Sequence, residues 1–113
     1  MTTQLKVQHL EALAKGNIVR SARAADKKLV TRRRLNPATL VRQVPDHWQT
    51  AMVADLLVSM PRVGRTRALR MMRSEGLEPS VRFNMLSPAR RERLARHVDA
   101  EVDKRNLVMG GLQ

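Results

Sequence analysis

The chain of 113 residues contains no cysteine and no tyrosine, and its only aromatic side chains are Trp48 and Phe83. Without cysteine, a disulfide framework, a cysteine-ligated zinc finger and thiol chemistry are excluded. The scarcity of aromatic residues argues against a binder of single-stranded nucleic acid, which uses aromatic rings as platforms for the bases. The core must be built from Leu, Val, Ala and Met, which suits packed helices better than a β-sandwich.

Long apolar runs are also absent, since stretches such as 52–54 and 56–58 are far too short to span a membrane. Nothing at the N-terminus resembles a signal peptide. We therefore expect a cytoplasmic protein with no membrane partner.

Acidic residues are few, with 10 Asp and Glu against 22 Lys and Arg, which gives a net charge of +12. Self-repulsion at this density favours a polyanionic partner, of which nucleic acid is the commonest, over an ordinary solvated surface. Arginine predominates over lysine, and its planar guanidinium group suits bidentate contact with phosphate. Binding should depend strongly on salt, because it releases counterions.

No catalytic pattern is present. His9, His47 and His97 are scattered, and none has a carboxylate at metal-ligand spacing. The chain has no phosphate-binding loop of the nucleotide hydrolases and no nucleophile elbow. We expect a non-enzymatic protein that uses no cofactor and no metal.

Apolar periodicity and helix-end signals predict an all-α fold, in which a long N-terminal helix precedes a compact helical domain. Residues 3–35 read as one helix or two, with Gly16-Asn17 as a possible break. Trp48 begins an apolar helical stripe that continues to Leu57, in a helix that Pro61 stops just after Met60. We expect Trp48 to anchor the core rather than to serve as a platform for base stacking. The other predicted helix boundaries are starts at Asn36-Pro37, Asp46, Gly64 and Ser87-Pro88, and a stop at Gly76.

The most informative segment is the 61–65 turn, Pro61-Arg62-Val63-Gly64-Arg65. One helix ends before it and another begins at Gly64, so free backbone N–H groups and the positive end of a helix dipole can bind an anion there. Gly64 lets a phosphate approach the backbone, and Arg62, Arg65 and Arg67 add charge. The alternative is an ordinary helix corner whose glycine serves the turn alone.

A second basic run, Arg32-Arg33-Arg34, lies near the end of the predicted helical region 3–35. It is interpreted either as a solvated helix end, where cations complement the dipole, or as a basic arm over the DNA backbone. The residues alone leave both interpretations open.

The segment around the turn resembles the actinobacterial integration host factor family. The matching residues are Ala54-x-Leu56-Leu57-x-x-Met60-Pro61-Arg62-Val63-Gly64-Arg65, Ala68, Met72, Gly76-Leu77-Glu78-Pro79, Arg82, Leu86, Arg91 and Leu94. The resemblance implies a helix-two-turn-helix motif and a nucleoid-associated protein. Such proteins bind duplex DNA with little sequence preference, bend or compact it and assist phage integration.

Carried over by position, the resemblance implies that the DNA-binding residues include Pro61, Arg62, Val63, Gly64 and Arg65. Arg67 is added because its charge lies close to the turn. The region after Pro79 would form a second contact. The family has a denser basic cluster there, whereas this chain keeps only Arg82, and Val81 and Asn84 depart from the pattern. The nearby Arg90, Arg91 and Arg93 are candidates to compensate, and the drift is consistent with a divergent or phage-borne member.

These observations divide the chain into a basic helical region (1–35), a helix-two-turn-helix DNA-binding domain (36–105) and a flexible tail (106–113). We expect a monomer in solution whose partners are double-stranded DNA and a phage integrase. Two alternatives stay open at this point. One is an RNA-binding or ribosome-associated protein that uses the same Pro-x-Val-Gly turn, and the other is a protein-interaction or membrane-surface module with a basic amphipathic helix.

Overall fold

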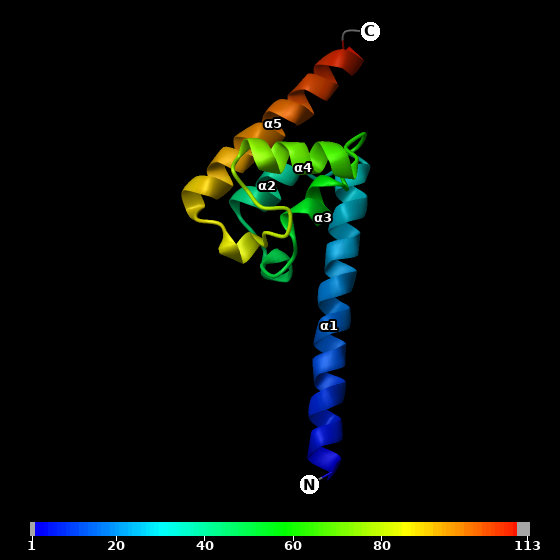
Figure 1. Cartoon of the computed structure of the whole chain (residues 1–113). Helices are drawn as coiled ribbons and strands as arrows, with labels where there is room; N and C mark the ends of the chain where they lie inside the picture. The colour runs from blue at the N-terminus through cyan, green and yellow to red at the C-terminus, as the bar shows by residue number, and fades with distance from the viewer. Residues whose placement is uncertain (1, 111–113) are drawn as a thin grey trace.

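The computed structural model describes the backbone of residues 2–110 and the side chains of residues 10–104, and over this range it is built from helices (Figure 1). The elements are α1 (Thr2–Thr31), α2 (Pro37–Arg42), the single 3₁₀ turn η1 (Asp46–Trp48), α3 (Val53–Leu57), α4 (Arg65–Ser74), the 3₁₀ turn η2 (Phe83–Met85) and α5 (Pro88–Gly110). The predicted all-α fold is confirmed. No helix in the described range is long and apolar enough to cross a membrane.

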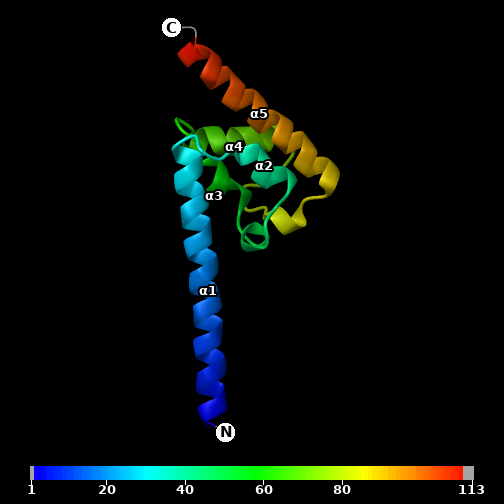
Figure 2. The same ribbon diagram turned by 180° about the vertical axis from the view of Figure 1, so that it is seen from behind.

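Helix α1 is a single helix of 30 residues, so Gly16-Asn17 does not break it. Its first half projects away from the rest of the molecule in both views (Figures 1 and 2). Its last turns dock through Val30, which is fully buried, and through Thr31, whose Oγ1 donates to the carbonyl of Ser59 at 2.7 Å. The docked end therefore fixes the position of the α1–α2 turn beside the segment that follows α3.

A polar cluster adds to this docking. The indole Nε1 of Trp48 donates to Asp26 Oδ2 at 2.8 Å, and His47 Nε2 lies 2.6 Å from the same oxygen. Arg23 donates to Thr50 Oγ1 at 2.7 Å and to the His47 carbonyl. Two residues of α1, Arg23 and Asp26, thus reach η1 and the segment after it, although they lie more than twenty residues away in the sequence.

The predicted helix from Asp46 to Met60 is wrong, because the chain breaks it into η1, a turn that ends in the extended residue Met52, and α3. Backbone pairing with a distant segment explains the break. Met52 and Arg82 form an isolated antiparallel bridge, in which the Val53 N–H donates to the Val81 carbonyl at 3.0 Å. The Phe83 N–H donates to the Ala51 carbonyl at 3.1 Å on the other side. These tertiary hydrogen bonds replace those that a continuous helix would make.

Trp48 is fully buried and anchors the core as predicted. Its ring meets Phe83 edge-on, with the ring centroids 6.0 Å apart. The core around this pair is aliphatic and methionine-rich, and no charged or polar residue in the described range is fully buried. The other large, fully buried side chains are Leu56, Leu57, Met72, Leu94, Val30, Val41, Val53 and Val98.

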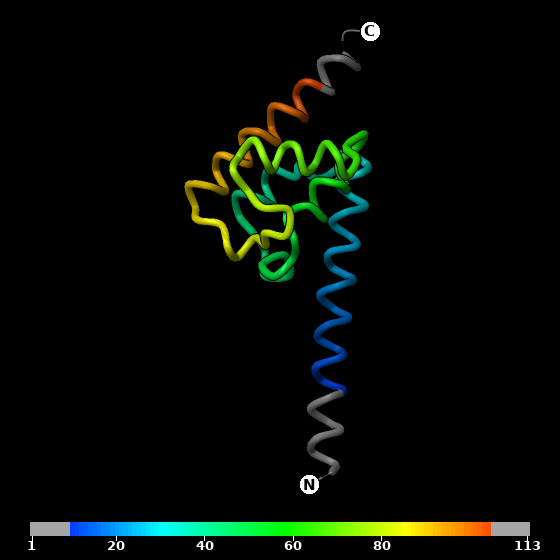
Figure 3. The backbone as a smooth tube through the Cα atoms, viewed as in Figure 1, coloured from blue at the N-terminus to red at the C-terminus, as the bar shows by residue number. Residues whose placement is uncertain are grey.

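The helix ends follow the local signals. The Asn36 side chain accepts from the Ala38 N–H at 2.9 Å, and Ser87 Oγ accepts from the Arg90 N–H at 3.2 Å. Gly76 has a φ of 70°, and it ends α4 with backbone hydrogen bonds to Arg73 and from Leu77 to Met72. Figure 3 follows the backbone from there through the second turn into α5. The predicted tail begins at 106, within α5, and residues 111–113 lie outside the described range.

Candidate nucleic-acid interface

The 61–65 turn is fixed to the core by two buried side chains, one just before the turn and one within it. Met60 and Val63 are buried, and the Val63 N–H donates to the Met60 carbonyl at 3.1 Å, which closes a β-turn over residues 60–63. Pro61 takes the second position of this turn and Arg62 the third, with a φ of 63°. That is the pattern of a type II turn, whose third position favours glycine. An exposed arginine in the left-handed region costs the fold about 1–2 kcal/mol, so this turn retains strain at a position that displays a charge.

Gly64 is the N-cap residue of α4, and its φ of −84° and ψ of 176° are open to any residue. A Cβ placed on Gly64 would meet nothing within 4 Å. Neither backbone conformation nor packing therefore requires glycine here, which argues against a glycine that serves the turn alone. What the missing side chain provides is open space in front of the first turn of α4.

The N-terminus of α4 has no side-chain cap. Its first backbone N–H groups have no partner within the helix, and they lie at the positive end of the helix dipole. The starts of α2 and α5 differ, because Asn36 and Ser87 cap them. Among these three helices, α4 is the one whose first donors stay open to an outside acceptor.

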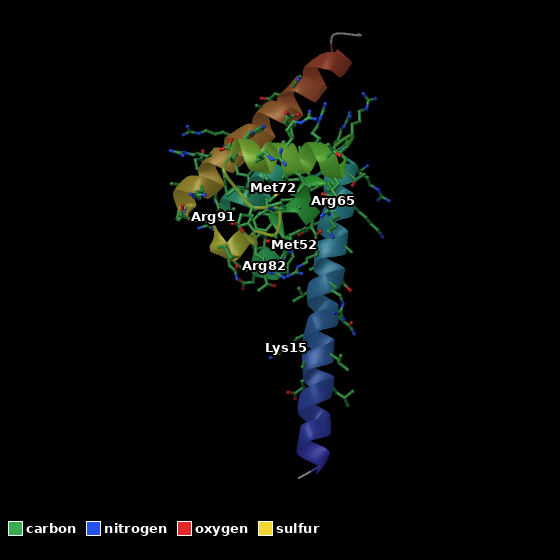
Figure 4. All side chains as sticks on the ribbon, in the orientation of Figure 1. Lys15, Met52, Arg65, Met72, Arg82 and Arg91 are labelled. Atoms are coloured by element: carbon green, nitrogen blue, oxygen red, sulfur yellow. The ribbon has the colours of Figure 1, made fainter. Side chains whose placement is uncertain are left out.

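The outward face of α4 carries only positive charge. Its ten residues include four arginines, Arg65, Arg67, Arg70 and Arg73, all of them exposed, and no acid. The opposite face buries Ala68, Met71 and Met72 in the core. Figure 4 shows Arg65 at the beginning of α4, on the side of the domain where α1 ends. This face can hold several phosphate groups.

The predicted basic run is placed next to the turn. Arg33 has a φ of 60° and ends α1, with its N–H donating to the Val30 carbonyl at 3.0 Å. The Arg34 N–H donates to the Leu29 carbonyl at 2.9 Å. These hydrogen bonds close the C-terminus of α1 around Arg33, the residue in the left-handed conformation. Arg33 and Arg34 line a cavity of about 300 Å³ together with Pro61. The fold thus joins two basic segments that lie almost thirty residues apart.

The predicted second contact region lies elsewhere. Arg82 is exposed, and its guanidinium group donates to the Thr50 carbonyl. Arg90 is exposed as well, whereas Arg91 is half-buried and its Nε is shielded from solvent without a hydrogen-bond partner in the described range. In Figure 4, Arg91 lies on the opposite side of the domain from Arg65, and Arg82 lies below α4, next to Met52 and away from Arg65. The candidate residues therefore form two groups on the surface.

Several acidic side chains pair with basic residues that lie outside α4. Glu92 and Asp99 both contact Arg42, at 3.0 and 2.9 Å. The hydrogen bond between Arg42 and Glu92 is the main cause of two shifts: it lowers the pKa of Glu92 and raises the pKa of Arg42. Glu75 pairs with His97 at 3.1 Å.

The histidine pairs were not foreseen from the sequence. His47 pairs with Asp26 and His97 with Glu75, over separations of 21 and 22 residues that no sequence spacing reveals. Each of these two histidines contacts a single carboxylate. No group of three or more metal-ligating side chains occurs within the described part of the chain.

No protein-family model matches this chain, and no curated protein sequence is similar to it. A solved structure of sIHF bound to an 8 bp palindromic DNA is similar in fold, with a TM-score of 0.68. The fold is of the sIHF type. The two chains are 26% identical, and the match covers 75% of this chain and 98% of the sIHF chain. This similarity supports the resemblance to integration host factors that the turn motif indicated.

Proposed function

We propose that this protein is a non-enzymatic, architectural, duplex-DNA-binding protein that holds the phosphate backbone at the 61–65 turn. The observation that carries the proposal is the uncapped start of α4, faced by the open space at Gly64. Its occurrence in a fold similar to that of a protein solved with DNA supports DNA as the ligand.

A backbone phosphate would accept hydrogen bonds from the first N–H groups of α4 and lie at the positive end of its dipole. Arg62, Arg65 and Arg67 would contribute charge and bidentate donors around it, and Pro61 and Val63 would position the turn. Contacts of this kind recognise phosphate rather than base identity. We therefore expect low sequence preference and association with the nucleoid.

A second contact at Arg82 and Arg90 would engage the duplex at a distance from the turn. Bending or compaction follows in this proposal, because one duplex must reach two separated basic groups. Assistance to site-specific integration by a phage integrase would follow from the bend. These finer functions rest on the two-group arrangement of the exposed arginines.

The test is a titration of fluorescent duplex DNA at several salt concentrations, with donor and acceptor dyes at the duplex ends to detect bending. We expect the logarithm of the affinity to fall linearly with the logarithm of the salt concentration. The slope of this line should be about −0.9 for each phosphate contacted. Arg65→Gln should bind about tenfold more weakly, since it loses a charge-assisted hydrogen bond.

Arg96→Gln removes the same charge from an exposed position on α5 and is the matched control, with affinity close to that of the wild type. Affinity that does not change with salt would contradict the proposal. Displacement of the duplex by an equal concentration of structured RNA would favour an RNA-binding function instead.

A further inference from the structure

Two arginines occupy the left-handed region of backbone conformation. Arg33 has a φ of 60° and Arg62 a φ of 63°, and within the described range they are the only residues other than glycine with positive φ. Glycine would adopt either conformation without strain. Side chains kept in strained turns concentrate at functional sites, so both positions point to a use for the guanidinium group.

The two turns that hold these arginines lie against each other. The hydrogen bond between Thr31 and Ser59 joins the segments just before them. A cavity of about 300 Å³ lies between them, with Arg33 on one wall and Pro61, the neighbour of Arg62, on the other. Its full lining is Val30, Arg33, Arg34, Leu35, Asn36, Pro37, Met60, Pro61 and Val102. One strained arginine, Arg33, therefore lines the cavity, and the other, Arg62, directly follows a residue that lines it.

The chemistry of this lining is divided between charge and apolar surface. Arg33 and Arg34 are its charged residues, and no acid contributes to it. Most of the other residues are apolar, and the Asn36 side-chain oxygen already accepts from the Ala38 N–H. The ligand that fits combines an anion with a compact carbon surface, and a volume of about 300 Å³ lies at the lower end of small-ligand sites.

We infer that this cavity is a subsite for one deoxyribose-phosphate unit of duplex DNA. The sugar would lie on the apolar wall, and its phosphate would contact Arg33 and Arg62. This inference rests on the proposed function, because Pro61 belongs both to the cavity and to the turn that would bind the neighbouring phosphate. A free nucleotide carries the same sugar-phosphate chemistry, but continuity with the 61–65 turn favours the duplex.

The test uses Arg33→Gly, Arg62→Gly and the double variant of the full-length protein. Glycine relieves the strain at both positions, so Arg62→Gly should melt at or above the wild-type temperature, by up to about 5 °C. In Arg33→Gly the same relief is set against the loss of the interaction that Arg33 already makes within the fold. Each single variant should bind duplex DNA about tenfold more weakly, as expected for the loss of a charged hydrogen bond. Each substitution should also reduce the steepness of the plot of log affinity against log salt concentration by about 0.9, the value for one phosphate contact.

If both arginines hold the same unit, their losses will not multiply. The double variant should bind on the order of 20-fold more weakly than the wild type, rather than the roughly 100-fold expected of independent sites. The matched control is Arg20→Gln, which removes the same charge from an exposed position on α1 about 20 Å before Arg33. Its affinity should stay within about twofold of the wild type.

Wild-type affinity in Arg33→Gly overturns the subsite, and so do losses that multiply in the double variant. If Arg62→Gly alone is weakened, the subsite fails while the proposed function stands. If the wild-type protein itself does not bind the duplex, the proposed function fails and the subsite fails with it. Displacement of the duplex by thymidine 5′-monophosphate at equal concentration would reassign the cavity to free nucleotides and overturn the assignment to DNA.

Discussion

The replacement of Gly64 by serine separates the stability of the fold from the binding of phosphate. Gly64 lies at the N-cap of α4 in an extended conformation that serine adopts without strain, and the space around its Cβ is empty. A serine hydroxyl there can accept from the N–H groups of Thr66 or Arg67, which are the groups that a phosphate would use. The same substitution should therefore stabilise the helix and block the proposed site.

The magnitudes can be estimated from the two local effects. A serine cap improves on glycine by a few tenths of a kcal/mol, and the lower entropy of the unfolded chain adds about 0.4–1 kcal/mol. The sum of about 1 kcal/mol raises the melting temperature of a domain of this size by about 4 °C. A phosphate that loses one N–H hydrogen bond and part of the dipole interaction loses on the order of 2 kcal/mol. That corresponds to about 30-fold in affinity.

Thermal denaturation and duplex titration of Gly64→Ser measure the two effects on the same preparation. Gly16→Ser is the matched control, because Gly16 lies within α1 and a Cβ on it would meet only the Arg20 side chain. It should leave the affinity unchanged. A Gly64→Ser variant that is more stable and still binds like the wild type would refute the role of the open helix start. One that unfolds more easily would refute the description of Gly64 as an unstrained N-cap.

Two further predictions concern the interactions that hold the helices together. Trp48→Phe removes the donor to Asp26 Oδ2 and keeps an aromatic ring in the core, so it should lower the free energy of unfolding by about 1–3 kcal/mol. Urea denaturation measures this change. An unchanged midpoint would show that the indole hydrogen bond contributes nothing to the docking of α1. The Arg42 contact lowers the pKa of Glu92, so its stabilisation is present above about pH 4.3 and is lost as the pH falls through the lower, folded-state pKa. Melting temperatures measured between about pH 6 and pH 3 should therefore fall more steeply in the wild type than in Glu92→Gln, and parallel curves would contradict the assignment.

Local signals in the sequence predicted the helix ends and the exposed turn. Asn36, Gly76 and Ser87 act through residues at most four positions away, and each occupies the predicted boundary. The arginines that follow Gly64 are exposed because α4 has a periodic apolar face, which the sequence displays directly. The roles of these arginines and of the second group at Arg82 and Arg90 stay predictions.

Long-range contacts decided the rest. The segment from Asp46 to Met60 carries a helical pattern, yet it breaks because the backbone around Met52 pairs with that around Arg82, about thirty residues later. In the same way, only the folded chain brings Asp26 to Trp48. No pattern within one segment encodes such pairings, since their free energy comes from groups that are distant in the sequence.

The 61–65 turn combines local and long-range effects. Its sequence predicted a helix start with open N–H donors, because proline and glycine act there on the local backbone. The tertiary structure decided which residue bears the strain, since it placed Arg62 and not Gly64 in the left-handed conformation. It also brought Arg33 to the same cavity, because the buried Val30 and Met60 pack the ends of two separate segments against one core.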